Sequence, residues 1–232
     1  SARGSMPVIR QALIGRPDRL ADDDAWERAL FLARRLTEQR AEQLGLAGFY
    51  VPSMSCRTIV YKALLQGSQL PVFYPDFRFP EFESAVAVFH QRYSTNTMPS
   101  WPLAHPYRLL AHNGEINTLW GNRNAMTMRT PLLKSPLWEG REDRLRDVIW
   151  PQGSDSASLD NALELFVASG RDPVHAVMMM IPQAWEKYAD VDPSVRAFYE
   201  YHACLHERWD GPAALAYTDG RMAGAAVERN GL

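Results

Sequence analysis

The sequence of 232 residues lacks the features that mark several specialised classes of protein. Its two cysteines, Cys56 and Cys204, are too few for a disulfide framework and lack metal-site spacing. No apolar run approaches the roughly 20 residues that a membrane helix needs, and residues 1–20 contain no apolar signal-peptide core. A net charge of −2 disfavours a nucleic-acid or membrane-surface protein, which would usually be strongly basic. A reducing, cytoplasmic compartment fits best.

The composition that remains is that of a globular domain. Hydrophobic residues make up 46% of the chain, which is enough to build a core. There are no repeats and no low-complexity linker, so we treat residues 1–232 as one partial domain. Residues 1–5, which precede Met6, are interpreted as a cloning remnant.

Four segments have the pattern of helices or buried core. Residues 22–45 begin with three aspartates, continue with apolar residues at helical spacing and end at a glycine. Residues 117–130 end before a proline, and residues 158–169 form an amphipathic pattern that ends before Gly170. Residues 174–181 carry three consecutive methionines, which favours core packing.

Short segments rich in β-branched and aromatic residues predict strands. They are residues 48–51, 84–92 and 108–112, and a hairpin of residues 213–217 and 223–228 around Asp219-Gly220. Asn113-Gly114 predicts a tight turn after the third of these strands, and residues 71–80 predict an ordered loop. Residues 58–61 fit a strand or a helix equally well. Several strands flanked by helices predict an α+β fold.

Polar residues gather at the ends of two of the predicted strands, where a rigid scaffold can present them to a ligand. The forked guanidinium of Arg92 suits a carboxylate. Asn113 offers an amide donor, and Gly114 lets a backbone N–H approach a ligand closely, so the pair has the composition of an oxyanion hole. Taken separately, an arginine at a strand end is more often a surface residue, and Asn-Gly is more often only a turn.

The residues of these segments and their order along the chain favour a ligand site over a surface arginine and a simple turn. Phe-His-Gln-Arg-Tyr-Ser-Thr-Asn-Thr at 89–97, His-Asn-Gly-Glu-Ile-Asn-Thr at 112–118 and Gly-Ser-Asp-Ser at 153–156 resemble blocks of the glutaminase domain of glutamate synthase. Met-Met-Met-Ile-Pro-Gln-Ala-Trp at 178–185 and the segment 209–220 resemble its later blocks. The resemblance, to a family of class II glutamine amidotransferases, covers about residues 25–232.

The resemblance implies an N-terminal-nucleophile hydrolase fold, here part of a four-layer αββα sandwich that is incomplete at both ends. It also implies attack by a cysteine thiolate on the amide of glutamine, release of ammonia, and hydrolysis of the thioester to glutamate. By the same resemblance, Arg92 binds the α-carboxylate, Thr95 helps to hold the substrate, Asp155 receives the α-amino group, and Asn113 and Gly114 stabilise the tetrahedral intermediate.

The implied partners are glutamine, the remaining domains of glutamate synthase and, as a further candidate, its small subunit. The resemblance implies no cofactor or metal in this chain, and FMN and an iron–sulfur cluster in other domains, where ammonia is transferred to 2-oxoglutarate. Neither a nucleic acid nor a membrane is expected as a partner. The electron donor of the parent enzyme, ferredoxin or a nicotinamide cofactor, stays open.

One part of the family pattern is missing from the sequence. The family's nucleophile is an N-terminal cysteine in a Cys-Gly-x-Gly context, whereas residue 1 here is serine. We therefore expect this chain to lack the nucleophile and to be inactive alone. Cys56 has no N-terminal amine as a base, and on a helix His202 and His206 would point away from Cys204. His90 either shapes the pocket or is structural.

Two other functions remain as alternatives. The first is a non-catalytic glutamine-binding or interaction module descended from this domain. The second is a different class II amidotransferase, which the wording Trp-Pro-Leu-Ala-His-Pro at 101–106 and Asn-Gly-Glu-Ile-Asn-Thr at 113–118 disfavours.

Overall fold

A computed structural model describes residues 2–91, 98–138, 140–186 and 190–228. The chain divides into two compact units, Ser1–Arg108 and Leu109–Leu232. Within the described ranges, no helix has the length and apolarity needed to cross a membrane.

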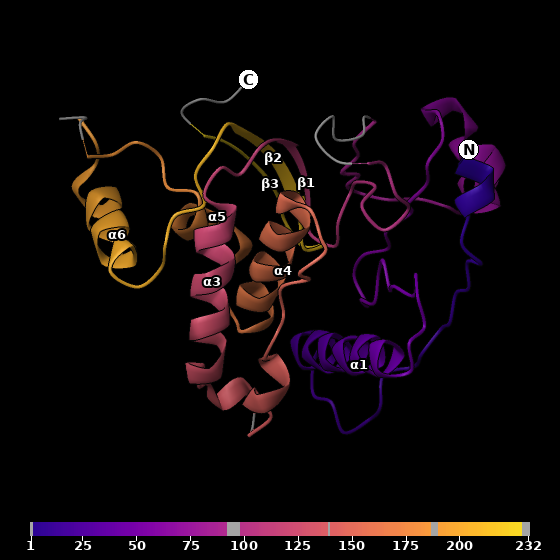
Figure 1. The fold of residues 1–232 in the computed structure, drawn as a ribbon, viewed down its shortest axis with the longest axis horizontal. Coiled ribbons are helices and arrows are strands. Elements are labelled where there is room, and N and C mark those ends of the chain that lie inside the picture. The colour runs from indigo at the N-terminus through magenta and orange to yellow at the C-terminus, as the bar shows by residue number, and fades with distance from the viewer. Residues whose placement is uncertain (1, 92–97, 139, 187–189, 229–232) are drawn as a thin grey trace. The chain divides into compact units, whose positions relative to one another are not determined.

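The first unit is organised by one long helix, α1 (Asp23–Gln43), which confirms the helix expected from the sequence (Figure 1). The side chain of Asp22 caps it by accepting a hydrogen bond from the N–H of Ala25. Its apolar face buries Trp26, Leu30 and Phe31, among others. The other elements of this unit are short: η1 (Ala2–Ser5), η2 (Gly67–Gln69), α2 (Leu70–Phe73) and η3 (Pro75–Arg78).

Two predicted strands of the first unit are wrong. Residues 48–51 and 84–91 are neither strand nor helix, and neither are residues 58–61. β-branched and aromatic residues favour a strand only where a partner strand offers hydrogen bonds, and within 2–91 there is none. Phe89 is accordingly 73% exposed. The loop expected at 71–80 contains most of α2 and all of η3.

Side-chain contacts replace a sheet as the framework of this unit. The phenol of Tyr61 donates a hydrogen bond of 2.7 Å to Asp76, and its ring packs against Tyr74 and Phe77. At α1, the carboxylate of Glu38 accepts from Arg34 at 2.7 Å and from Arg108 at 3.0 Å. These contacts hold the irregular segments in place.

The second unit contains an antiparallel sheet of three strands in the order β1-β2-β3. The strands are β1 (Leu110–Gly114), β2 (Ala213–Thr218) and β3 (Ala223–Val227). The strand at 108–112 and the hairpin are thus confirmed, and Asp219 closes the hairpin turn by accepting from the N–H groups of Arg221 and Met222. The turn predicted at Asn113-Gly114 is wrong, because both residues continue β1 opposite Ala214 and Ala213.

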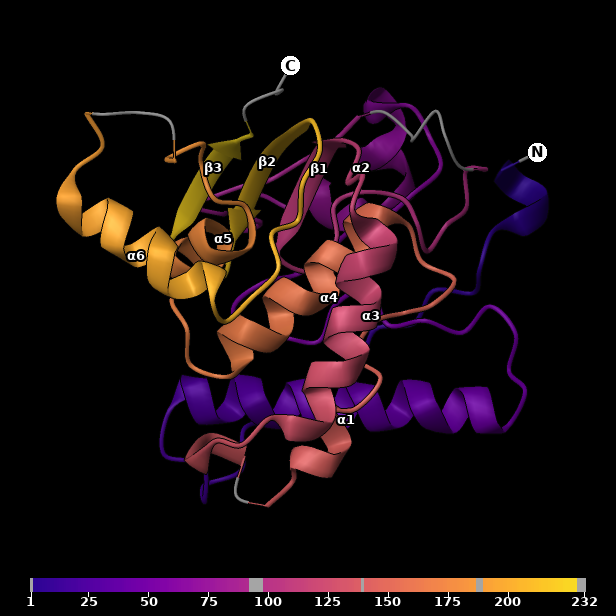
Figure 2. The same cartoon turned by 60° about the vertical axis from the view of Figure 1, so that its left-hand side comes forward.

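Helices α3 (Leu119–Arg129), α4 (Asp155–Ala168), α5 (Pro173–Met180) and α6 (Pro193–Ala203) complete this unit, together with η4 (Thr130–Leu132), η5 (Pro136–Trp138) and η6 (Glu142–Leu145). Figure 2 shows α3, α4 and α5 grouped beside the sheet. The predicted helices near 117–130 and 158–169 are confirmed, but α4 begins three residues early, where Ser154 caps it by accepting from the N–H of Ala157. The methionine run is confirmed as core, since Met179 and Met180 are buried.

Helix α4 is matched to β1 residue by residue. The carboxylate of Asp160, fully buried, accepts hydrogen bonds from the N–H groups of Leu109 at 2.9 Å and Leu110 at 3.2 Å. One helical turn nearer the start of α4, the hydroxyl of Ser156 lies 2.7 Å from Nδ1 of His112. A helical turn rises about 5.4 Å and two strand residues span about 6.6 Å. Because these lengths are similar, side chains one turn apart on α4 can contact residues two positions apart on β1. The result is a mixed helix-and-strand fold with a small sheet, as the α+β prediction expected.

We expect Asp160→Ala to lower the free energy of unfolding by roughly 3 kcal/mol, because one buried and one partly buried backbone N–H group lose their acceptor. Asp160→Asn keeps one acceptor oxygen and should cost less. The exposed Asp143, replaced by Ala, serves as the control and should change stability by less than about 0.5 kcal/mol. Urea unfolding measures all three, and equal costs for Asp160→Ala and Asp143→Ala would contradict the capping role.

Stability should also fall in mild acid because of His206. Burial and the nearby positive charge of Arg129 lower its pKa from 6.5 to about 4. Between these two pH values the unfolded chain binds the proton and the folded chain does not, so stability is full above pH 6.5 and falls as the pH drops toward 4. The loss from this group is roughly 3 kcal/mol. Between pH 7 and 4, the unfolding midpoint should fall less steeply with pH in His206→Leu than in the unmodified protein. An equally steep fall in both would contradict the assignment.

Candidate functional site

The end of β1 presents a backbone donor on its open side. Thr218 donates its N–H to the carbonyl of Leu109, and Glu115 donates to Pro212, so these positions are hydrogen-bonded pairs of the β1–β2 ladder. In an antiparallel ladder such pairs alternate with pairs that make no ladder bond. Gly114 falls in the second class, and its N–H therefore points away from β2. Asn113 and Gly114 are both exposed.

Gly114 is required here by its surroundings. Its φ of +144° lies in a region that side chains disfavour, and a Cβ at this position would lie 1.9 Å from the carbonyl oxygen of Pro212. The segment that follows β1 stays paired with the one that precedes β2. The N–H of Asn117 donates to Asp210 at 2.7 Å, and Asn122 of α3 donates to the carbonyl of Arg208 at 2.9 Å. The backbone at Gly114 is thus fixed on both sides.

Asp155 is held beside this strand end. It is the first residue of α4, where the positive end of the helix dipole favours a carboxylate. Its Oδ2 accepts a hydrogen bond of 2.9 Å from the N–H of Ile116, two residues after Gly114. Its side chain remains 21% exposed. Its Oδ1 accepts a longer hydrogen bond of 3.4 Å from the hydroxyl of Ser156. The carboxylate is therefore anchored mainly through Oδ2 at the end of β1 while it stays accessible to a ligand.

A buried pair lies behind this carboxylate. His112 is 2% exposed, and its Nδ1 lies 2.7 Å from the hydroxyl of Ser156 and 3.9 Å from Oδ2 of Asp155. Because side chains alternate along a strand, His112 faces α4 and Asn113 faces the other side of the sheet. His112 thus contacts the first turn of α4 from the buried face of the sheet, and the side chain of Asn113 lies on the opposite, exposed face.

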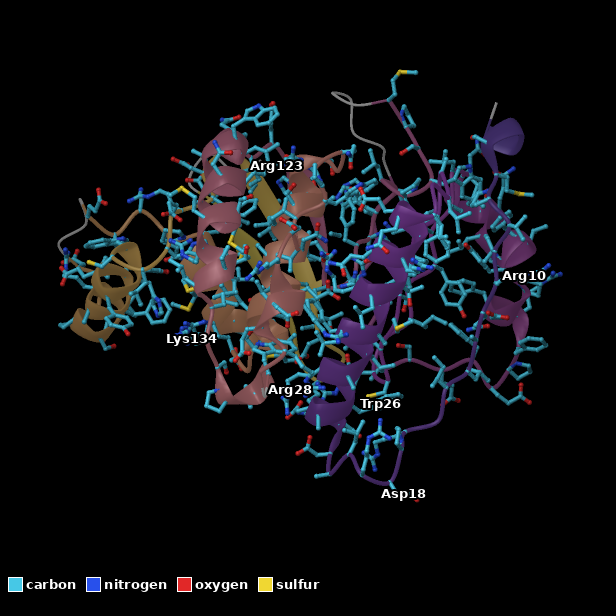
Figure 3. All side chains as sticks on the ribbon, turned by 60° about the horizontal axis from the view of Figure 1, so that its bottom comes forward. Arg10, Asp18, Trp26, Arg28, Arg123 and Lys134 are labelled. Atoms are coloured by element: carbon cyan, nitrogen blue, oxygen red, sulfur yellow. The ribbon has the colours of Figure 1, made fainter. Side chains whose placement is uncertain are left out.

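Arg123 of α3 binds the residues on either side of Asp155 at the start of α4. Its Nη2 donates to the carbonyl of Gly153 at 2.6 Å, Nη1 to that of Pro151 at 3.1 Å, and Nε to the hydroxyl of Ser158 at 3.0 Å. Figure 3 shows Arg123 where α3 faces α4. Burial lowers the pKa of this guanidinium, and the charge of Asp155 acts in the opposite direction. A guanidinium stays protonated under any such shift, so it holds the segment before Asp155 as a cation.

The structure brings together three of the five residues expected from the sequence. Asn113, Gly114 and Asp155 surround the end of β1. Arg92 and Thr95 lie outside the described residues. Sequence reasoning missed three supporting residues, His112, Ser156 and Arg123. For His112 and Ser156, their position inside the motif blocks at 112–118 and 153–156 was the available signal. Arg123 lies five residues beyond the first of these blocks.

The remaining candidates of the sequence have other surroundings. Burial, followed by its hydrogen bond with Glu27, raises the pKa of Cys56 to about 11, so it is a thiol rather than a thiolate at neutral pH. Cys204 is exposed and contacts the carbonyl of Glu200. His90 stacks on His105 with ring centroids 4.6 Å apart. Among the described residues, no three His, Cys, Asp or Glu side chains gather in a way that could hold a metal ion.

Comparisons with known proteins agree with these motif blocks. The family described as glutamine amidotransferases class-II matches residues 1–232. The chain is 46% identical, over 231 residues, to the glutamate synthase [NADPH] large chain of Bacillus subtilis (strain 168), covering 100% of the chain and 15% of that protein. It is 45% identical, over 217 residues, to the ferredoxin-dependent glutamate synthase of Pyropia yezoensis, covering 90% of the chain and 14% of that protein. The chain thus spans about one seventh of the length of these curated relatives.

We expect Gly114→Ala to distort the end of β1, because its Cβ would collide with the carbonyl of Pro212 and φ would be strained. The free energy of unfolding should fall by about 3 kcal/mol. Gly121→Ala is the matched control: it lies in α3 with no atom within 4 Å of the new Cβ, and should stabilise by up to about 1 kcal/mol. Urea unfolding of both variants tests this, and similar effects in both would contradict the role of Gly114.

Proposed function

The chain belongs to the class II glutamine amidotransferases, and from this membership we propose that it forms the glutamine-binding part of a glutaminase within a glutamate synthase. The observation that carries the proposal is the end of β1. There an outward backbone N–H and an exposed amide side chain lie on neighbouring residues, and a partly exposed carboxylate is hydrogen-bonded to the backbone two residues further on. These are the groups that an α-amino acid with a side-chain amide requires.

The charged ends of glutamine need one anion and one cation. We assign the α-amino group to Asp155, whose Oδ2 is fixed by Ile116. The α-carboxylate is assigned to Arg92, with Thr95 beside it, on the motif Arg-x-x-Thr alone. A substrate that lacked either charge would leave one of these groups without its partner, which is how such a site discriminates.

Asn113 and Gly114 are assigned to the side-chain amide. When a thiolate adds to the amide carbon, the carbonyl oxygen gains a negative charge that needs donors already in place. The N–H of Gly114 and the Nδ2 of Asn113 can supply two. The carbon–nitrogen bond then breaks as the nitrogen takes up a proton and leaves as ammonia, and a thioester remains. Water hydrolyses the thioester, which releases glutamate and restores the thiol. We assign the nucleophile to neither cysteine of this chain, since the raised pKa of Cys56 and the helix-end position of Cys204 suit neither for the role.

The proposal extends to the four-layer αββα sandwich. Helix α4 packs on β1 from one face of the sheet, with α5 beside it, which leaves the face of Asn113 for a second sheet. That face carries small side chains, among them Ala214, Ala216 and Ala225, which are exposed or half-buried. Small residues permit the close approach, about 10 Å, of two packed sheets.

The remaining chemistry is proposed for other parts of the protein. The relatives are named as NADPH or ferredoxin-dependent glutamate synthases, and the chain covers only a small share of each. We propose that ammonia released here is transferred to 2-oxoglutarate in another domain, which would hold FMN and an iron–sulfur cluster. The other domains, and a small subunit, are the proposed partners, and the cytoplasm is the proposed compartment.

Steady-state glutaminase assays on the full-length gene product test the assignment. Asn113→Ala should lower kcat about 100-fold with a small change in KM, because its donor acts mainly on the developing charge. Arg92→Ala should instead raise KM for glutamine by roughly 10- to 100-fold, because it binds the substrate and the transition state alike. Asn124→Ala, an exposed asparagine of α3, is the matched control and should leave both parameters unchanged.

Two results would overturn the proposal. Full activity in Asn113→Ala would remove the oxyanion role from the end of β1. Glutamine binding by calorimetry without any glutaminase activity in the full-length protein would favour a non-catalytic glutamine-binding module instead.

A further inference from the structure

Arg123 uses its whole guanidinium on residues that flank Asp155 on both sides. All three nitrogens donate hydrogen bonds, to three backbone carbonyls and one hydroxyl. The carbonyls belong to Pro151, Gly153 and, at the longest distance of 3.5 Å, Ser154. The hydroxyl belongs to Ser158, which is fully buried and donates in turn to the carbonyl of Ser154 at 3.0 Å. The arginine therefore holds both the approach to α4 and its first turn.

The held segment has little room to move. A Cβ on Gly153 would lie 3.0 Å from Cβ of Ala157 and 3.0 Å from Cε3 of Trp150. Ser154 caps α4, and Asp155 follows directly as the first helical residue. Any shift in these carbonyls therefore moves the carboxylate of Asp155 as well.

Arg123 also belongs to the chain segment that carries the amide donors of the site. It lies on α3, which follows β1 after four residues, so the same continuous segment carries Asn113, Gly114 and Arg123. The guanidinium joins this segment to the start of α4, and the hydrogen bond from Ile116 to Asp155 is the second link between the two. Together the two links set the separation between the amide donors and the carboxylate.

We propose that Arg123 is a positioning residue for substrate recognition, which holds Asp155 at the separation from Asn113 and Gly114 that an amino acid with a γ-amide spans. It acts through Asp155 and makes no contact with substrate of its own. This inference rests on the proposed function, because it assumes that Asp155 pairs with the α-amino group.

The geometry of the contacts requires an arginine. Its planar fork presents donors in three directions, which matches acceptors on Pro151, Gly153 and Ser158. A lysine would keep the positive charge near Asp155 but would place one ammonium where three fixed donors stood. Arg123→Lys therefore separates positioning from charge.

The test compares two substrates of the full-length gene product: L-glutamine and glutaramate, which is glutamine without the α-amino group. Where a compound turns over too slowly, its affinity is measured as a competitive inhibitor. The ratio of kcat/KM for glutamine to that for glutaramate reports the contribution of Asp155. We expect Arg123→Lys to lower this ratio about 10-fold or more, through a higher KM for glutamine, with little change for glutaramate.

Three further variants make the result specific. Arg129→Lys is the matched control, because Arg129 lies on the same helix and makes a two-pronged contact with Glu207 at 2.7 and 3.1 Å. It should leave the ratio unchanged. Asp155→Asn should lower the ratio at least as much as Arg123→Lys does. The double variant Arg123→Lys/Asp155→Asn should lower it no further than Asp155→Asn alone, since one residue acts through the other.

Each of the other possible results refutes one step of the proposal. An unchanged ratio in Arg123→Lys, or an equal loss of activity on both substrates, refutes the positioning role, because a merely structural effect does not distinguish the substrates. A ratio that is additive in the double variant refutes action through Asp155. If Asp155→Asn leaves the ratio unchanged, the assignment of the α-amino group fails, and the role of Arg123 fails with it.

Discussion

The hydrogen bond from the N–H of Ile116 to Oδ2 of Asp155 joins the two segments on which the site depends. One segment carries β1 and the exposed pair Asn113 and Gly114, and the other begins α4 39 residues later. At the opposite end of β1, Asp160 of the same helix accepts from Leu109 and Leu110. A helix fixed at both ends of a strand cannot slide along it. The fold can therefore hold polar groups at the open end of β1 with a set spacing.

The elements that depend on local sequence could be predicted. Helix α1 follows from its acidic start and apolar spacing, and the β2–β3 hairpin follows from Asp219-Gly220. The errors arise where a distant partner decides. Asn113-Gly114 has the local pattern of a turn, yet it extends β1 because β2, a hundred residues later, pairs with it. Residues 84–91 have the composition of a strand, and within 2–91 no strand pairs with them. The early start of α4 was the one avoidable error, since Ser154 followed by Asp155 is a capping signal.

For the site, too, local motifs identified some residues, whereas distant contacts determine the rest. Motif resemblance named Asn113, Gly114 and Asp155, but no pattern along the chain could show that the N–H of Gly114 turns away from β2. That direction follows from the ladder register, which only the pairing of β1 with β2 determines. The contacts of Arg123 reach acceptors 28 to 35 residues away, so its role could not be read from spacing. Arg92 and Thr95, outside the described residues, stay predictions.

Asp155 performs two tasks that conflict unless its oxygens are divided between them. A carboxylate that binds an ammonium group must stay accessible, while a carboxylate that anchors a helix start is usually consumed by backbone N–H groups. Here the cap of α4 is supplied by the hydroxyl of Ser154, Ile116 donates to Oδ2, and Oδ1 has only a long contact of 3.4 Å with Ser156. The rigidity that capping by Asp155 would have given comes instead from Arg123, which binds the carbonyls just before it. The hydroxyl and the guanidinium thus take over the structural task, and the carboxylate is left accessible for a ligand. A site of this kind should be more sensitive to the geometry of Arg123 than to its charge.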